Sequence, residues 1–392
     1  MPWHRSVPRA APVSTSEVVS AVKARSVVIA AGGTGGHIFP GLALADAIKR
    51  AAPGTRIAFV GTKRGLESRL VVDAGYPLDL IDMVPMVRDQ LVRFPFALVR
   101  SVVQARRILR ERGADVAVGM GGYSSAPLMI AARTARIPSL IHESGAIPGR
   151  ANLFAARFTG NIALSFATAA KSFKRARVVG MPISDDLSRT PDPAQRAVHR
   201  ATFGVPHGAR VVLVIGGSQG ATTLNRAAIG LAKRWLTRED LFIILKTGKA
   251  HLADIEREID ALGAGERIRC LSFIEKMSEA YGVADVAVCR AGAGTIAELA
   301  AVGLPAVLIP YPHAPYDHQA VNASVLVETG GAEMVRDHEA TPDRLGGIIE
   351  KMLDDPEALM ARRESLRSVA HPQAADELAR WVLELGGLVA SG

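Results

Sequence analysis

The sequence predicts an α/β protein made of two Rossmann-like, doubly wound parallel-sheet domains that face a shared cleft. Short apolar runs alternate with amphipathic helical segments along almost the whole chain, which is typical of parallel sheets covered by helices. Glycine-rich turns follow several of these runs, at the strand ends where open α/β sheets bind ligands. The alternation stops over 181–206, where prolines are frequent, and then begins again.

The pattern divides the chain into five segments. Residues 1–24 lack the apolar core of a signal peptide, so we expect a loose tail. Residues 25–180 form a first domain, 181–206 a junction with one short helix, and 207–370 a second domain. The remaining residues, 371–392, form a C-terminal helix that could cross back to the first domain.

The expected strands follow from apolar runs bounded by turn residues. In the first domain they are 27–31, 57–60, 78–84, 115–118, 139–142, 162–164 and 178–179. In the second they are 211–215, 241–246, 268–271, 285–289, 306–309 and 332–335. Helices are expected between them, among others from the first glycine turn to about Arg50, over 66–74 and 126–133, and along the tail from 342.

The amino-acid composition argues against several classes of protein. The chain has 392 residues, of which 48% are hydrophobic and 5% aromatic, so it can bury a large core. Its cysteines, Cys270 and Cys289, are far apart in sequence, which argues against a disulfide framework and a structural zinc site. We expect no membrane-spanning helix, because no apolar run reaches about 18 residues. The net charge of +9 leaves nucleic acid, an anionic membrane and simple solubility open.

The glycine-rich turns at 32–37, 119–125, 216–221 and 290–295 are the main chemical signal. Glycines allow a tight turn and expose backbone N–H groups, and the helix that follows points its positive end at the same place. These turns predict a pocket for oxygen-rich, anionic ligands. The alternative is a purely structural strand-to-helix turn, which is weakened because the pattern recurs.

The segment 83–113 is strongly basic, with seven arginines against two acidic residues. On a helix from about Phe96, we expect Leu98, Val99, Val102 and Leu109 on one face and Arg100, Arg107 and Arg110 on another. Together with Phe94 and Phe96, these arginines predict an element that binds an anionic membrane surface. The alternative is an ordinary surface helix with its apolar stripe turned inward.

Several motifs resemble a known family when they are taken together and in order. They lie at 32–37, 119–123, 142–143, 216–221, 289–293 and 317–323. They are similar to the signatures of the MurG family, the N-acetylglucosaminyltransferases of peptidoglycan synthesis in glycosyltransferase family 28. The resemblance extends over roughly residues 26–385 and is specific as a set, although each motif alone is weak.

The resemblance implies a GT-B fold and transfer of N-acetylglucosamine from UDP-GlcNAc to lipid I, with inversion, to give lipid II. It also implies a peripheral enzyme at the cytoplasmic face of the inner membrane, with anionic phospholipid and other cell-wall synthesis proteins as partners. No cofactor and no metal motif are implied. A helix N-terminus at 291–295 could stabilise the charge on a departing diphosphate without a metal.

Donor-site residues follow from the same matching. Glu298 matches the carboxylate that accepts from ribose hydroxyls, Ile274 the residue whose backbone binds uracil, and Ser218 a phosphate or nucleotide contact. The other expected donor-side residues are Thr34, Gly35, Gly36, Ala293, Gly294, Thr295, Gln319 and Asn322. The alternative for Glu298 is a solvated charge on a helix. The alternative for the side-chain amides of Gln319 and Asn322 is helix capping or surface solvation.

On the acceptor side, the resemblance places Tyr123, Glu143 and Asn152. His37 is the candidate general base, because its ordinary pKa lies near neutrality and a helix N-terminus disfavours its protonated form. The alternative is that His37 only orients its loop or contacts diphosphate. His142 ends a strand and is expected to be a buried, hydrogen-bonded histidine.

Two departures from the family pattern are visible. Gly145 stands where the family has a side-chain amide, and Ser184 stands where it has an arginine. Either change could alter donor affinity or acceptor choice. The rival functions are therefore a GT-B transferase with another lipid or small acceptor, and a degenerate UDP-sugar-binding protein. A nucleic-acid-binding protein ranks last, because only the net charge suggests it.

Overall fold

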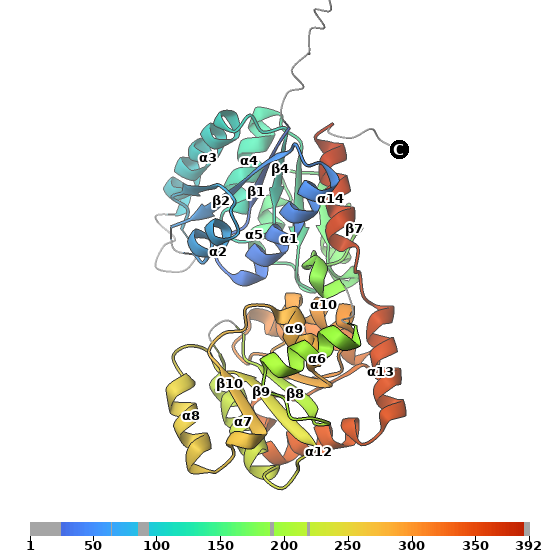
Figure 1. Ribbon diagram of the computed structural model, residues 1–392. Helices are drawn as coiled ribbons and strands as arrows, with labels where there is room; N and C mark the ends of the chain where they lie inside the picture. The colour runs from blue at the N-terminus through green and yellow to red at the C-terminus, as the bar shows by residue number, and fades with distance from the viewer. Residues whose placement is uncertain (1–24, 64, 85–93, 189–191, 218–219, 388–392) are drawn as a thin grey trace, which may run out of the picture.

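The computed structural model describes residues 25–63, 65–84, 94–188, 192–217 and 220–387. Two α/β domains lie one above the other, each with a central parallel sheet covered by helices (Figure 1). The predicted fold class is therefore confirmed. The exact limits of the domains stay a prediction.

The N-terminal sheet has seven strands in the order β3-β2-β1-β4-β5-β6-β7. The strands are β1 (Ser26–Ala30), β2 (Arg56–Thr62), β3 (Leu78–Ile81), β4 (Val116–Gly119), β5 (Ser139–Glu143), β6 (Asn161–Leu164) and β7 (Arg177–Val178). The helices are α1 (Gly35–Ala51), α2 (Glu67–Asp73), α3 (Phe94–Glu111), α4 (Ser125–Ala135) and α5 (Arg150–Ala155). The strand order changes direction between β1 and β4, which puts their two glycine turns next to each other.

The C-terminal sheet has six strands in the order β10-β9-β8-β11-β12-β13. They are β8 (Arg210–Ile215), β9 (Leu241–Lys246), β10 (Ile268–Leu271), β11 (Val286–Cys289), β12 (Ala306–Leu308) and β13 (Ala332–Met334). The α-helices after residue 192, in chain order, are α6 (Pro193–Thr202), α7 (Thr222–Arg234), α8 (Leu252–Ala261), α9 (Met277–Val283), α10 (Ala293–Val302), α11 (His318–Val327), α12 (Pro342–Leu353), α13 (Pro356–Ser368) and α14 (Ala374–Leu385).

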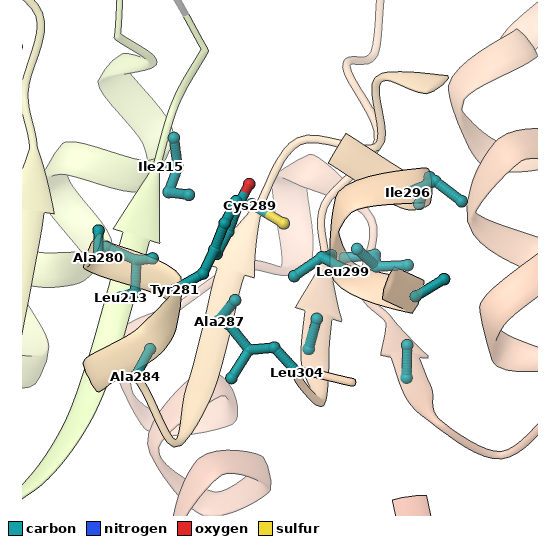
Figure 2. Packing of buried hydrophobic residues seen from close by; sticks show 14 of the residues in the cluster. Leu213, Ile215, Ala280, Tyr281, Ala284, Ala287, Cys289, Ile296, Leu299 and Leu304 are labelled. Carbon is teal, nitrogen blue, oxygen red and sulfur yellow. The ribbon is translucent and has the colours of Figure 1, made fainter. Parts of the chain in front are cut away.

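The strands read as continuous apolar runs because both faces of each sheet are covered. Along β8, Leu213 and Ile215 pack into one core, while Val212 and Val214 pack into another on the opposite face. Figure 2 shows the first of these cores, where β8 and β11 meet Tyr281 of α9 and the side chains of α10. This core holds α10 against the sheet and thereby fixes the direction of its N-terminus.

Helix α14 lies beside α1 on the N-terminal sheet (Figure 1). Its apolar face, which includes Leu378 and Val382, shares a core with Val27 and Ile29 of β1. An ion pair between Arg50 and Asp376 lies at the edge of this contact, at 2.8 Å. The last helix of the chain thus packs against the first domain.

Contacts between the domains involve the loops at the carboxyl ends of strands. The backbone N–H of Ala146, after β5, donates to Oδ1 of Asn322 on α11 at 3.0 Å. The carboxylate of Asp186 in the junction accepts a hydrogen bond from Ser278 of α9. Helices α1 and α10 are also in contact. The glycine turns of the two domains therefore lie on the sides that face each other.

Helix α1 begins within the first glycine turn, at Gly35, and Pro40 lies inside it. Helix α10 begins at Ala293, so the fourth glycine turn itself forms the first helical turn. Within the described ranges, no helix has both the length and the apolar character needed to cross a bilayer.

Candidate functional site

The N-terminus of α10 is the strongest anion-binding feature of the C-terminal domain. Gly292 caps the helix with extended backbone, and the first intrahelical bond runs from the N–H of Ile296 to Gly292. The N–H groups of Ala293, Gly294 and Thr295 precede that bond and have no backbone partner in the described structure. Three expected donor residues thus present backbone donors and the positive end of a helix dipole.

Glu298 lies one turn further along α10 and is mostly buried. Its Oε2 accepts a hydrogen bond from the hydroxyl of Tyr281 at 2.8 Å. Burial raises the pKa of Glu298, while the Tyr281 hydrogen bond and the positive charge of Lys246 lower it. Burial also raises the pKa of Tyr281, so this hydroxyl keeps its proton and remains a donor. Tyr281 holds Oε2, while Oε1 makes no hydrogen bond with any described residue and can accept one from a ligand.

Gln319 and Asn322 on α11 fix the loop in front of α10. The Oε1 atom of Gln319 accepts from the backbone N–H of Ala291 at 3.2 Å and from that of Tyr311 at 2.9 Å. Asn322 is buried and donates to the carbonyl of Ala291 at 3.1 Å while accepting from Ala146. The Nε2 amide of Gln319 has no partner within the described part of the chain, so it can still donate to a ligand.

Ile274 follows β10 and is buried, whereas Phe273 beside it is exposed over 52% of its surface. The backbone of Ile274 lies near the carboxyl edge of the sheet, on the side of β9 away from β8. Ser218 falls in the third glycine turn and lies outside the described residues.

The first glycine turn depends on Glu67 of α2, a residue that sequence reasoning missed. Its buried carboxylate accepts from the N–H of Gly33 at 3.0 Å, and from the N–H and hydroxyl of Thr62 at 2.7 and 2.9 Å. A side chain at Gly65 would collide with this carboxylate. The sequence signal that could have identified Glu67 is an acidic residue at the start of a helix that follows a strand and a glycine.

His37 lies in the first turn of α1, behind Thr34, Gly35 and Gly36. Its Nδ1 lies 3.3 Å from the carbonyl oxygen of Gly32, which can only accept, so Nδ1 carries the proton. The other ring nitrogen, Nε2, therefore holds a free electron pair. Burial lowers the pKa of His37, although the Gly32 carbonyl and the charge of Glu67 act in the opposite direction. The neutral ring with a basic Nε2 is the form that a general base requires.

The second glycine turn packs directly against this histidine. A Cβ at Gly121 would lie 2.5 Å from the His37 ring, and one at Gly122 would lie 2.3 Å from the Gly32 carbonyl oxygen. Both glycines have positive φ, so the turn needs glycine for conformation as well as for space. Tyr123 follows with an exposed ring. The first two turns therefore form one unit around His37.

Glu143 and Asn152, expected on the acceptor side, are buried and bonded to each other. The carboxylate of Glu143 accepts from the N–H groups of Gly145 and Gly149 at 2.8 and 3.0 Å, and from Asn152 Nδ2 at 3.0 Å. Burial raises the pKa of Glu143 while these donors lower it. The pair holds the loop at 145–149, including the glycine that replaces the family's amide.

His142 is fully buried, as expected, and its Nε2 donates to the carbonyl of Gly180 at 3.0 Å. Burial lowers the pKa of His142 to about 4. No group of three metal-ligating side chains occurs within the described segments.

Helix α3 lies at an outer edge of the N-terminal domain (Figure 1). Phe96, Val99 and Val103 are exposed, and Phe94 is partly buried. The prediction that Val99 shares the buried face of Leu109 is wrong, because Val99 is 66% exposed and Leu109 1%. Ten residues along a helix leave two side chains about 80° apart. Arg100, Arg107 and Arg110 are exposed, and the first two pair with Asp82 and Glu111.

Solved structures share this architecture. Acinetobacter baumannii MurG matches with a TM-score of 0.72 and 30% identity, over 92% of this chain and 99% of that chain. An S. aureus MnaA structure with UDP matches with a TM-score of 0.69 at 11% identity, over 94% and 98%, and shows the fold alone. The two facing domains, with glycine turns at their strand ends, define the GT-B fold.

Sequence comparison identifies the family within this class. The glycosyltransferase family 28 N-terminal domain matches residues 27–164, and the C-terminal domain of the same family matches residues 211–378. A curated relative from Saccharopolyspora erythraea is 41% identical over 93% of this chain and 95% of its own length. One from Mycolicibacterium vanbaalenii is 40% identical over 92% and 90%. Both are named UDP-N-acetylglucosamine–N-acetylmuramyl-(pentapeptide) pyrophosphoryl-undecaprenol N-acetylglucosamine transferase. The chain belongs to glycosyltransferase family 28, as the motifs predicted.

Proposed function

We propose that this protein transfers N-acetylglucosamine from UDP-GlcNAc to lipid I and produces lipid II with inversion at the anomeric carbon. One observation carries the proposal: the N-terminus of α10 and the His37 unit lie on facing domains. The free N–H groups of α10 and Glu298 are on one side, and His37 is on the other. The names of the curated relatives supply the identity of the two substrates.

On the donor side, the N–H groups of Ala293, Gly294 and Thr295 stabilise the negative charge that develops on the departing diphosphate. Glu298 accepts hydrogen bonds from the ribose hydroxyls through the oxygen that Tyr281 leaves free. Ile274 binds uracil through its backbone, and Ser218 contacts phosphate. Gln319 binds the sugar through its amide nitrogen, while Asn322 aligns the two domains.

On the acceptor side, His37 acts as the base. The hydroxyl oxygen of the acceptor sugar attacks the anomeric carbon of the donor while its proton passes to Nε2. The bond from that carbon to the diphosphate oxygen breaks, and UDP leaves. The backbone of Thr34, Gly35 and Gly36 lies beside His37 and binds the acceptor diphosphate or the donor sugar. Tyr123 contacts the acceptor, and Glu143 with Asn152 shapes its loop.

The direct test is UDP release by purified protein with UDP-GlcNAc and a short-chain lipid I analogue. We expect release only when that acceptor is present. Release with other lipids in place of lipid I would identify a transferase of different acceptor choice. Tight UDP-GlcNAc binding without release would identify a UDP-sugar-binding protein and contradict the proposed reaction.

We further propose that the exposed face of α3 holds the protein at the cytoplasmic face of the inner membrane. Phe96, Val99 and Val103 recur at helical spacing on this face, and Arg106 and Arg110 make no ion pair within the described residues. Apolar side chains that enter the interface, flanked by arginines that attract anionic headgroups, are the features of a reversible membrane contact.

Charge reversal tests this surface. Replacing Arg100, Arg107 and Arg110 by Glu should abolish sedimentation with phosphatidylglycerol vesicles, since each basic residue near such a surface contributes about 1 kcal/mol. Arg269→Glu, at an exposed position on β10, is the control and should sediment like the wild type. Unchanged sedimentation of the triple variant would return α3 to the role of a surface helix.

A further inference from the structure

Lys246 is a buried lysine at the carboxyl edge of the C-terminal sheet. It ends β9, where it lies beside Ile215 of β8 and Leu271 of β10. Only 7% of the residue is exposed. Its position is therefore between the glycine turn that follows β8 and the Phe273–Ile274 segment that follows β10.

Strand alternation puts Lys246 on the same face of the sheet as the donor-site helices. Phe242 and Ile244, four and two residues earlier in β9, pack into the core that contains Tyr281 of α9 and Ile296 of α10. Lys246 continues that row at the open end of the core. There its positive charge acts on Glu298, the carboxylate that Tyr281 orients.

The ammonium group of Lys246 makes no ion pair and no hydrogen bond with the described residues, although the charge of Glu298 acts on it from farther away. Nζ lies over the ring of Phe273, 5.4 Å from the ring centroid. Burial lowers the pKa of Lys246, and Glu298 opposes this effect. A mostly buried ammonium is costly unless an oxygen binds it. The missing partner is thus expected from a ligand.

We propose that Lys246 is a further donor-binding residue, which donates a hydrogen bond to an oxygen of the nucleoside part of the nucleotide. Glu298 accepts from the ribose hydroxyls, and Lys246 donates from the sheet edge below, so the nucleoside lies between a fixed acceptor and a fixed donor. The exposed ring of Phe273 lines the same place. This inference rests on the proposed function, because it assigns one more contact within the same nucleotide site.

Isothermal titration with UDP tests the assignment. Lys246→Met keeps the length of the side chain and removes its charge, and should weaken UDP binding by about 10- to 100-fold, the usual effect of losing a charge-assisted hydrogen bond. Lys249→Met is the matched control, because Lys249 is exposed in the loop that follows β9, three residues after Lys246. It should bind UDP as the wild type does. Wild-type affinity in Lys246→Met would overturn the inference.

Titration with uridine separates the two ends of the nucleotide. A nucleoside contact predicts the same fold-loss for uridine as for UDP, whereas a loss with UDP alone would place the ammonium on phosphate and overturn the assignment. Thermal unfolding without ligand checks the fold. Lys246→Met should melt no lower than the wild type, because it removes a buried charge. A lower melting temperature together with weaker binding would make Lys246 structural. Failure of the wild type itself to bind UDP would instead overturn the proposed function.

Discussion

His37 has a fixed tautomer and a lowered pKa, and both properties come from its surroundings in the fold. The Gly32 carbonyl holds the proton on Nδ1, and the backbone of Gly121 packs so closely on the ring that a Cβ there would collide with it. Because burial lowers the pKa of His37, its Nε2 stays unprotonated at neutral pH. The residue is available as a base over the whole physiological range.

The pH profile of the reaction follows from this residue. As pH falls, kcat/KM should decline only below about pH 6.5, where the lowered pKa of His37 is reached. His37→Asn can still donate to Gly32 but has no Nε2, so kcat should fall about 10²- to 10⁴-fold. His207→Asn alters an exposed histidine and serves as the control. A His37→Asn enzyme with near-normal kcat would make His37 an orienting residue only.

At the scale of elements, the first glycine turn is held by a helix that follows in the chain. Glu67 of α2 satisfies three donors from the turn and from β2, so its replacement by Gln brings an amide NH₂ group against a backbone N–H. We expect Glu67→Gln to destabilise the domain by about 1–3 kcal/mol, seen as a lower urea midpoint. Glu111→Gln breaks an exposed ion pair and should leave the urea midpoint close to that of the wild type. Equal midpoints for the two variants would refute this role.

These contacts show why the sequence predicted some parts of the site and not others. Parallel strands buried on both faces appear as apolar runs in a sequence, so the fold could be predicted. Glycine turns at strand ends mark a candidate site, whose ligand contacts stay a prediction. Glu67 and Gly33 are 34 residues apart, and only the packing of α2 brings them together. Likewise, the family resemblance predicts Asn322 near the donor, but it could not reveal that both ends of its amide are bonded to the protein.

On the scale of the whole molecule, a few polar groups link the two domains and the junction, and two of them, Asn322 and His142, are buried. Asn322 links α11 to the loop after β5, and His142 links β5 to Gly180, where the chain leaves the N-terminal sheet. Asp186 then connects the junction to α9. The relative position of the two glycine-turn units therefore depends on a few groups, one of which can titrate.

His142 makes the stability of the protein depend on pH. Its pKa is about 4 in the fold and about 6.5 in an unfolded chain, so the unfolded state takes up a proton first as pH falls. The stabilisation is complete above about pH 6.5 and is lost as pH falls toward 4; between pH 7 and 5 the loss reaches about 2 kcal/mol.

His142→Gln can still donate to Gly180 but cannot gain this charge. Urea unfolding at pH 7 and 5 should therefore show a smaller loss for His142→Gln than for the wild type. His313→Gln, which removes an exposed imidazole, should keep the wild-type loss, and an equal loss in all three proteins would contradict a neutral, buried His142.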